Sequence, residues 1–395
     1  MTYLSAGSAG SAGSAGSAGS AGSAGSAGAM NGVPAYAGVV TNPMMLLAIE
    51  STRQHLAKYL PTTWGALAHL PGNPAKQMLP IDKPQLLKRW QADCRAAVLQ
   101  FEAMEGLWWK PIKSPSASDP AGGGGSFELL MPNGKKESLI TITRPTPKVL
   151  ELQAKDVADR AKDRMQPKSE EPSKRDRICE IGVQVVPQYA FWSSVLPLHP
   201  ERMPRTLELM QLALDVAFIV EQRFKHAMAV PRPHEINPSV CPVLLTPAHA
   251  SLPSGHSTEA FTIATLMTAL LQDDNGTGAT LRRLAQRIAD NRQVAGLHYA
   301  IDTMAGQLLG TVLGEYLAAR CRDGSVKAGV FDGTLLDGTE ACQETGNPPT
   351  LKAVRREDPL KVYHSKQLFW LWHEARLEWG ADPDEDKALA DADAK

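Results

Sequence analysis

The sequence has little of several features that mark large classes of proteins. Its five cysteines are odd in number, widely spaced and without a C-x-x-C pair, which argues against a disulfide framework or a zinc ribbon. Lys and Arg number 41 against 42 for Asp and Glu, so a strongly basic face for nucleic acid is not expected. The longest apolar stretches, such as residues 261–271, fall short of the roughly 18–20 residues that span a bilayer. We therefore predict neither a membrane span nor a nucleic-acid partner.

Residues 5–28 lack large apolar side chains and charges altogether. They are eight Ser-Ala-Gly repeats, which cannot bury a core, so we expect an engineered or tag-derived linker over residues 1–30. The linker could have replaced a natural signal peptide at the original N-terminus. Two locations are therefore open, the cytoplasm and the outside of the cell after export. We expect a single domain over residues 31–380, followed by a disordered tail over 381–395. The domain should consist of an N-terminal helical part with a hairpin (31–200), a catalytic bundle core (201–322) and a C-terminal helix (323–380).

Apolar periodicity predicts a mainly α protein, a helical bundle with one small β-hairpin. Helices are expected over residues 43–60, 84–104, 207–226, 257–271, 281–294, 299–320 and 360–379. Gly306, Gly310 and Gly314 recur every four residues, a spacing that permits close helix packing. The hairpin is expected from the strand-like segments 127–131 and 138–143, which flank an Asn-Gly turn.

Three further stretches carry weaker expectations. Gly122–Ser126 is either a natural loop or a second engineered join. Residues 166–177 are rich in both charges and predict a solvated connector. Trp370, Trp372 and Trp379 lie on the last predicted helix, where aromatics either pack into the core or supply an interface for a homo-oligomer.

The first segment with chemical content joins Lys225 to Arg232. Lys225 falls near the end of a predicted helix, and Pro231 and Pro233 force Arg232 into an extended path. Two cations at one bend suit a single anion, although basic residues also stabilise a helix C-terminus without any ligand.

The second segment is Pro253-Ser254-Gly255-His256, at the start of a predicted helix. Free backbone N–H groups at a helix start attract anions, and Gly255 lets the backbone come close to a ligand. Ser254 adds a hydroxyl and His256 a proton donor near the same point. An ordinary serine cap beside a solvent-facing histidine is the alternative.

The third segment is Arg292-Q-V-A-G-L-His298-Y-A-I-Asp302. Residues four apart share one helix face, so Asp302 can accept a hydrogen bond from one imidazole nitrogen of His298 and leave the other bare. Arg292 supplies a bidentate fork for oxyanions. A His/Asp pair alone also occurs in purely structural ion pairs.

Together the segments hold what a tetrahedral oxyanion needs on its way to a five-coordinate state, namely positive charge, neutral donors, a bare nitrogen and a proton donor. The order K-x6-R-P, P-S-G-H and R-x5-H-x3-D resembles the superfamily of vanadium-dependent haloperoxidases and type 2 phosphatidic acid phosphatases. The resemblance covers about 80 residues, from Lys225 to Asp302. Asn291 departs from it, since many members have Ser at that position.

The resemblance implies an α-helical bundle that holds the oxyanion between its helices. In haloperoxidase members the cofactor is vanadate, the residue matching His298 is the axial vanadium ligand, and the one matching His256 assists peroxide. Their partners are hydrogen peroxide, a halide and a small organic acceptor. In phosphatase members no cofactor is needed: His298 would attack a phosphomonoester and form a phosphohistidine, His256 would protonate the leaving group, and Asp302 would orient the nucleophile. In both cases the implied oxyanion ligands are Lys225, Arg232, Ser254, Gly255 and Arg292.

Three features bear on the choice between the two chemistries. Once residues 1–30 are set aside, about 190 residues precede Lys225, more than in the compact phosphatases of this superfamily. His249 stands where haloperoxidases that oxidise bromide often have a second histidine, although a loop residue that only packs is the alternative. Gln222 stands where several haloperoxidases have Trp, which argues the other way. We expect a haloperoxidase with bromide as its halide, with the phosphatase as the alternative.

Functions from other classes are less well supported. A serine hydrolase would need Ser254 on a strand-to-helix elbow, which Pro253 in a helical chain does not supply. A zinc enzyme lacks an H-E-x-x-H motif or a cysteine pair. A non-catalytic helical module that uses the pocket only to bind oxyanions stays open.

Overall fold

The computed structural model describes residues 43–59, 81–112, 125–131, 137–165, 173–185, 188–334 and 354–382. The predicted linker and all but the first residues of the predicted tail lie outside these ranges. Contacts divide the chain into two compact units between Val98 and Leu99, and each is described by itself. The three-part division of residues 31–380 stays a prediction.

The first unit is a short series of helices. It contains α1 (Pro43–Leu56), the 3-10 helices η4 (Ala57–Tyr59) and η6 (Pro84–Arg89), and the beginning of α2 (Ala92–Met104). The predicted helix at 84–104 is therefore interrupted around Trp90. There the Arg95 guanidinium donates to the carbonyls of Leu87 and Trp90, which takes up backbone acceptors left at the end of the 3-10 helix.

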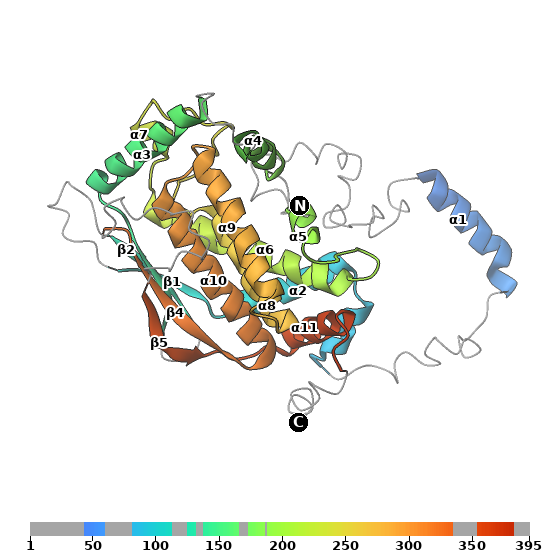
Figure 1. Ribbon diagram of the computed structural model, residues 1–395. Coiled ribbons are helices and arrows are strands. Elements are labelled where there is room, and N and C mark those ends of the chain that lie inside the picture. Colours follow the sequence, from blue (N-terminus) through green and yellow to red (C-terminus); the bar gives the residue numbers. More distant parts are fainter. Residues whose placement is uncertain are drawn as a thin grey trace. The chain divides into compact units, whose positions relative to one another are not determined.

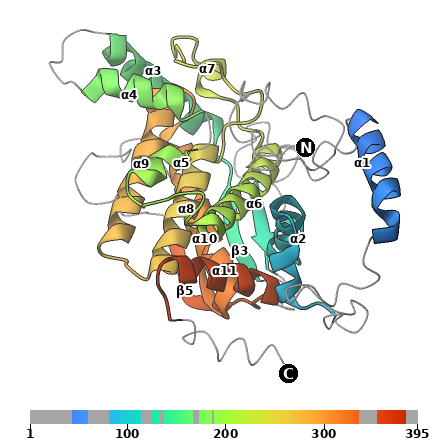
Figure 2. The ribbon, with the colours of Figure 1, turned by 90° about the vertical axis from the view of Figure 1, so that its right-hand side faces the viewer.

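The second unit is mainly helical, as predicted. Its helices are α3 (Pro147–Met165), α4 (Ser173–Val183), α5 (Tyr189–Ser193), α6 (Pro204–Met228), α7 (Pro233–Ile236), α8 (Gly255–Leu271), α9 (Thr277–Val294), α10 (Ala300–Arg322) and α11 (Lys366–Glu378). Figures 1 and 2 show α8, α9 and α10 side by side. No helix within the described ranges has both the length and the apolar character needed to cross a bilayer.

The glycines of α10 allow it to pack closely on α8. A methyl group added at Gly306 would lie 2.6 Å from the carbonyl oxygen of Ser254, and one added at Gly314 would lie 2.6 Å from Cβ of Thr265. Any larger side chain would push the two helices apart. The predicted role of the glycine spacing is confirmed, and it fixes the distance between the helix starts that carry the second and third motifs.

The predicted hairpin is part of a larger sheet. Its strands follow the order β1 (Trp108–Ile112), β2 (Ser126–Leu130), β3 (Ser138–Thr143), β4 (Ser325–Asp332) and β5 (Val354–Lys361). β2 and β3 are antiparallel, as expected, and their Asn-Gly turn lies outside the described residues. β3 and β4 are parallel, and the helices α3 to α10 all lie between these two strands in the chain. Figure 1 shows the sheet beside α10, where a Cβ atom added at Gly329 of β4 would lie 3.0 Å from Leu308.

Two local predictions are wrong. Residues 173–177, expected in a solvated connector, form the first turns of α4, and residues 166–172 lie outside the described ranges. The last helix begins at Lys366 rather than near residue 360, because 354–361 pairs with β4 as a strand.

The tryptophans considered for a subunit interface lie in the chain's own packing. Trp370 and Trp372 are buried, and the indole N–H of Trp379 donates to Oγ1 of Thr206 at 3.0 Å. The Arg205 guanidinium lies over the Trp370 ring, 5.4 Å from its centre. These contacts dock α11 on the start of α6, which fits the core-packing alternative.

Candidate functional site

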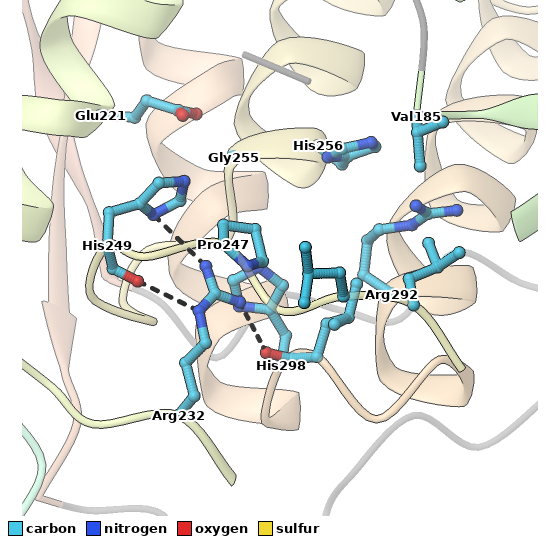
Figure 3. Close-up of a pocket in the computed structure, with 12 residues that line it drawn as sticks. Val185, Glu221, Arg232, Pro247, His249, Gly255, His256, Arg292 and His298 are labelled. Carbon is cyan, nitrogen blue, oxygen red and sulfur yellow. Dashed lines mark hydrogen bonds between the residues drawn. The ribbon is translucent and has the colours of Figure 1, made fainter. Parts of the chain in front are cut away.

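The three motifs meet at one pocket (Figure 3), which is lined by Val185, Glu221, Arg232, Leu244, Leu245, Pro247, His249, Gly255, His256, Arg292, Leu297 and His298. Six of the nine predicted site residues are in that set. The other three are Lys225, Ser254 and Asp302, and each is buried among the same elements.

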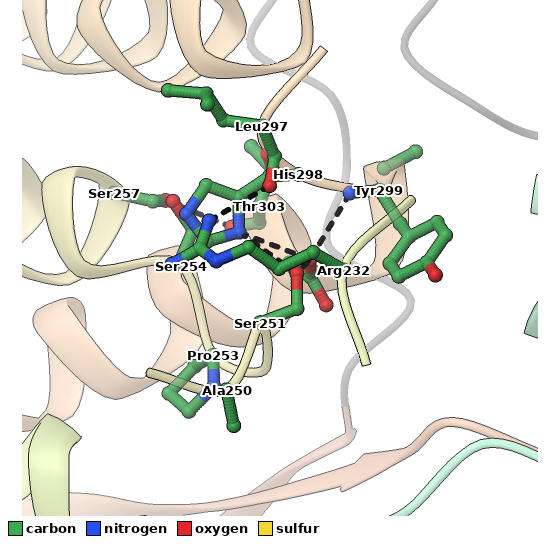
Figure 4. A network of polar contacts seen from close by, with 12 residues as sticks. Arg232, Ala250, Ser251, Pro253, Ser254, Ser257, Leu297, His298, Tyr299 and Thr303 are labelled. Atoms are coloured by element: carbon green, nitrogen blue, oxygen red, sulfur yellow. Dashed lines mark hydrogen bonds and ion pairs between the residues drawn. The ribbon is translucent and has the colours of Figure 1, made fainter. Parts of the chain in front are cut away.

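His298 is fixed by Asp302. Its Nδ1 lies 3.0 Å from Oδ2 of Asp302, and the same oxygen accepts hydrogen bonds from Ser251 Oγ at 2.5 Å and from the Tyr299 backbone at 3.0 Å (Figure 4). A carboxylate facing Nδ1 keeps the proton there, so Nε2 carries the lone pair. The bare nitrogen predicted from the sequence is therefore present.

The route to this contact differs from the prediction. His298 lies before α10, and Tyr299 is the residue that caps its start. The contact therefore forms at the helix N-terminus rather than along one helix face. The positive φ of Gly296, 76°, turns the chain back between the end of α9 and His298, a conformation that glycine adopts without strain.

Lys225 holds the loop that precedes the P-S-G-H motif. It is 1% exposed, and its ammonium donates to the carbonyls of Ala250, Ser251 and Pro253. Burial lowers the pKa of Lys225, and the neighbouring Glu221 works in the opposite direction. Lys225 thus adds positive charge behind the pocket while its N–H groups are bonded to the loop.

Ser254 is not an ordinary helix cap. It stands at the N-cap of α8, but its hydroxyl makes no capping bond, and among the described residues this buried oxygen has no partner. Gly255 follows as the first residue of α8, where backbone N–H groups have no acceptor within the helix. A buried hydroxyl without a partner costs about 1–3 kcal/mol, so the site is better satisfied with a ligand than without one.

Arg232 and His249 form one wall of the pocket. Arg232 is extended, as the flanking prolines predict, and donates to the carbonyls of His249 at 3.0 Å and Leu297 at 2.9 Å. Its Nη2 lies 3.3 Å from Nδ1 of His249. Burial, with the charge of Lys225, lowers the pKa of His249 to about 4, so its ring is neutral at neutral pH.

Arg292 and His256 form the opposite wall, and both are tied to Gln184. Arg292 Nη2 donates to the Gln184 side-chain oxygen at 2.8 Å, while His256 Nε2 lies 2.9 Å from the Gln184 carbonyl. Arg292 Nε is buried with no partner among the described residues. Burial, with the charge of Arg292, lowers the pKa of His256 to about 3. His256 is thus neutral, with Nε2–H engaged and Nδ1 as its remaining nitrogen.

Several residues at this site were not anticipated, Glu221 and Gln184 among them. Glu221 precedes Lys225 by one turn of α6, and this four-residue spacing could have placed it on the same face. Gln184 lies 72 residues before His256, and no local pattern connects the two.

The donors present suit a tetrahedral oxyanion. Arg232, Arg292 and Lys225 supply positive charge, while Ser254 Oγ and Arg292 Nε are buried with no partner in the part of the chain that the structure describes. Burial, with the charges of Arg232 and Lys225, holds the pKa of His298 well below its usual 6.5. Its Nε2 is therefore available as a nucleophile or as a ligand to vanadate.

Comparisons with known proteins give two kinds of match. The family model described as the PAP2 superfamily matches residues 209–322. A bacterial vanadium-dependent iodoperoxidase is 19% identical with a TM-score of 0.34, and the match covers 52% of this chain and 51% of that one. A transmembrane PAP2-type phosphatidylglycerolphosphate phosphatase from Bacillus subtilis is 18% identical with a TM-score of 0.30, covering 42% of this chain and 89% of that one.

The chain thus spans about half the length of the iodoperoxidase. The comparison with curated proteins finds no match. The family match includes α8, α9 and α10 entirely, and therefore the P-S-G-H and R-x5-H-x3-D motifs. It confirms the resemblance carried by the three motifs: residues 209–322 match the model of the PAP2 superfamily.

Proposed function

We propose that the chain is a vanadate-dependent haloperoxidase that oxidises a halide, expected to be bromide, with hydrogen peroxide to a hypohalous acid. The oxyanion pocket and the superfamily match support an enzyme. The observation that carries the choice of chemistry is His249. It lies in the pocket wall against Arg232 rather than packing as an ordinary loop residue, at the position where the resemblance puts the second histidine of bromide-oxidising members.

Vanadate bound here would supply a Lewis-acidic centre that activates peroxide towards halide. His298 would hold it through Nε2, and the oxygens would be bound by Arg232, Ser254, Gly255 and Arg292. His256 handles the proton: its Nδ1 accepts the one that hydrogen peroxide loses and returns it to the departing water. Because Nε2–H is bonded to the Gln184 carbonyl, the ring stays oriented while Nδ1 gains and loses this proton. Overall, halide, peroxide and one proton give hypohalous acid and water.

The second candidate is an acid phosphatase with a phosphohistidine intermediate. Gln222 supports it, because it stands where several haloperoxidases have Trp and its amide donates at 3.3 Å to Glu221 of the pocket. In that chemistry Nε2 of His298 attacks phosphorus, and His256, after taking up a proton from solvent at Nδ1, gives that proton to the leaving oxygen. Water then cleaves the phosphohistidine.

Orthovanadate added to the purified protein separates the candidates. Bromide-dependent oxidation of a phenol-type dye by peroxide supports the haloperoxidase. Hydrolysis of p-nitrophenyl phosphate that vanadate inhibits, without bromination, supports the phosphatase and overturns the first choice. Thermal protection by vanadate or phosphate without either turnover indicates the non-catalytic module, since a ligand that binds only the folded state raises stability.

A further inference from the structure

The pocket contains a carboxyl group that none of the three motifs includes. Glu221 of α6 lines the pocket and is 1% exposed. Its Oε1 accepts from the Gln222 amide at 3.3 Å, while Oε2 is buried and has no partner among the described residues. A lone carboxylate oxygen is costly to bury and would repel an anion in the same pocket.

This carboxyl group lies directly beside the predicted anion-binding backbone. A Cβ atom added at Gly255 would lie 2.6 Å from Glu221 Oε1 and 2.9 Å from Oε2. A side chain at position 255 would therefore have to displace the carboxyl group of Glu221. An oxyanion bound at the start of α8 would be a near neighbour of Glu221.

The surroundings favour a proton on this group. Burial raises the pKa of Glu221 above its usual 4.5, although Lys225, Gln222 and Arg232 oppose the rise. From α8, Glu259 adds a second carboxyl group whose own pKa burial raises well above the usual range, and Glu221 raises it further. The remaining titratable groups around the pocket are Arg292, His249, His256 and His298.

We infer, on the basis of the proposed oxyanion site, that Glu221 binds the ligand as a neutral acid, with the protonated carboxyl donating a hydrogen bond to an oxyanion oxygen. Loss of that proton replaces a donor with a negative charge against the ligand. One proton is then taken up with the oxyanion whenever Glu221 starts ionised. Glu221 thus determines specificity: as pH rises, the pocket discriminates increasingly against highly charged oxyanions.

Sulfate is the probe for this inference, because its charge stays constant from about pH 5 to about pH 9. If sulfate binding raises the pKa of Glu221 by at least one unit, the wild-type affinity for sulfate should fall at least about tenfold across this range. Glu221→Gln keeps an N–H donor in nearly the same volume and cannot ionise. Its affinity should stay closer to the acid value, so at about pH 9 it should bind sulfate at least about tenfold more tightly than wild type. Glu201→Gln, which removes one exposed carboxylate, should follow wild type.

A second measurement needs no variant. Calorimetry of sulfate binding in buffers of different ionisation enthalpy should show proton uptake by wild-type protein, and less uptake by Glu221→Gln. If sulfate binds but both proteins share one pH profile, or if wild type takes up no proton, the role of Glu221 is overturned and the oxyanion site stands. If neither sulfate, phosphate nor vanadate binds at any pH, the proposed function is overturned as well.

Discussion

Two histidines of the pocket, His298 and His256, are held in place by different means. His298 is held chiefly by Asp302, four residues later in the chain, at 3.0 Å, and Ser251 from the preceding loop is bonded to the same carboxylate. His256 is held by the Gln184 carbonyl, which reaches it from the end of α4, 72 residues away in the chain. The position of His298 is therefore set mainly by the chain around the start of α10, and that of His256 depends on α4 docking against the bundle.

That docking is itself polar. Gln184 accepts from both Arg292 and Asn291, while Glu180 forms a two-bond ion pair with Arg287 at 2.9 Å. Asn291, the position that departs from the superfamily pattern, also donates to Glu180 at 2.7 Å. The departure therefore has a structural purpose, because this amide connects α9 to α4. Substitutions around His298 should therefore lower turnover, whereas substitutions around α4 should weaken ligand affinity first.

The largest effect should come from His298→Ala. Removing Nε2 removes the nucleophile or vanadate ligand, so turnover of either substrate class should fall by at least about 10³-fold while the helical fold persists. Steady-state kinetics and circular dichroism test this together. His226→Ala, an exposed histidine on α6, is the matched control. Near-normal turnover in His298→Ala would remove His298 from the mechanism.

A smaller loss is expected from Arg292→Lys on the α4 side. A point charge cannot keep the bond to Gln184 and also offer a planar fork to the ligand. The dissociation constant for vanadate should rise about 10–100-fold, with Arg283→Lys, an exposed change on the same helix, as control. An unchanged constant, measured by titration, would exclude Arg292 as an oxyanion ligand.

Gln184→Ala tests the docking without altering any residue of the three motifs. It removes the acceptor shared by Arg292 and Asn291 but leaves the backbone carbonyl that holds His256. Oxyanion affinity should weaken about tenfold, with turnover at saturating substrate less affected. Gln54→Ala on α1 provides the control. A fall in turnover as large as that of His298→Ala would show that the surroundings of His298 and the docking of α4 do not act separately.

The smallest effect concerns Glu180 and acid pH. The hydrogen bond from Arg287 holds the pKa of Glu180 below its usual 4.5. The ionised form therefore stabilises the folded chain above about pH 4.5, and this contribution is lost as pH falls through the lower folded-state value. Because both side chains are partly exposed, the pair should contribute about 0–1 kcal/mol. At about pH 7, wild type should unfold at a higher temperature than Glu180→Gln, and near pH 3 the two should unfold at the same temperature. An equal difference in unfolding temperature at both pH values would show that ionisation of Glu180 does not contribute to stability.

The predictable part of the site is the part made by short-range geometry. The spacing of His298 and Asp302 indicated their contact, although it forms through the cap of α10 rather than along a helix face. Gln184 could not be found this way, because only tertiary packing brings it to His256. Strands β4 and β5 were missed for the same reason, since β4 is defined by pairing with β3, which lies far away in the chain. Glu221 was within reach of the helical spacing, but its significance depends on burial and on the space beside Gly255, which a sequence does not display.

The glycine spacing of α10 has a consequence for how such a pocket can change. Ser254 and Gly306 meet where α8 packs against α10, with no room for one added methyl group. A substitution at Gly306 would therefore alter the separation of α8 from α10 without changing any group that binds a ligand. Changing the distance between α8 and α10 would resize the cavity for a bulkier oxyanion while the ligand-binding groups stay the same. Gly306 is therefore a suitable position for redesigning the site.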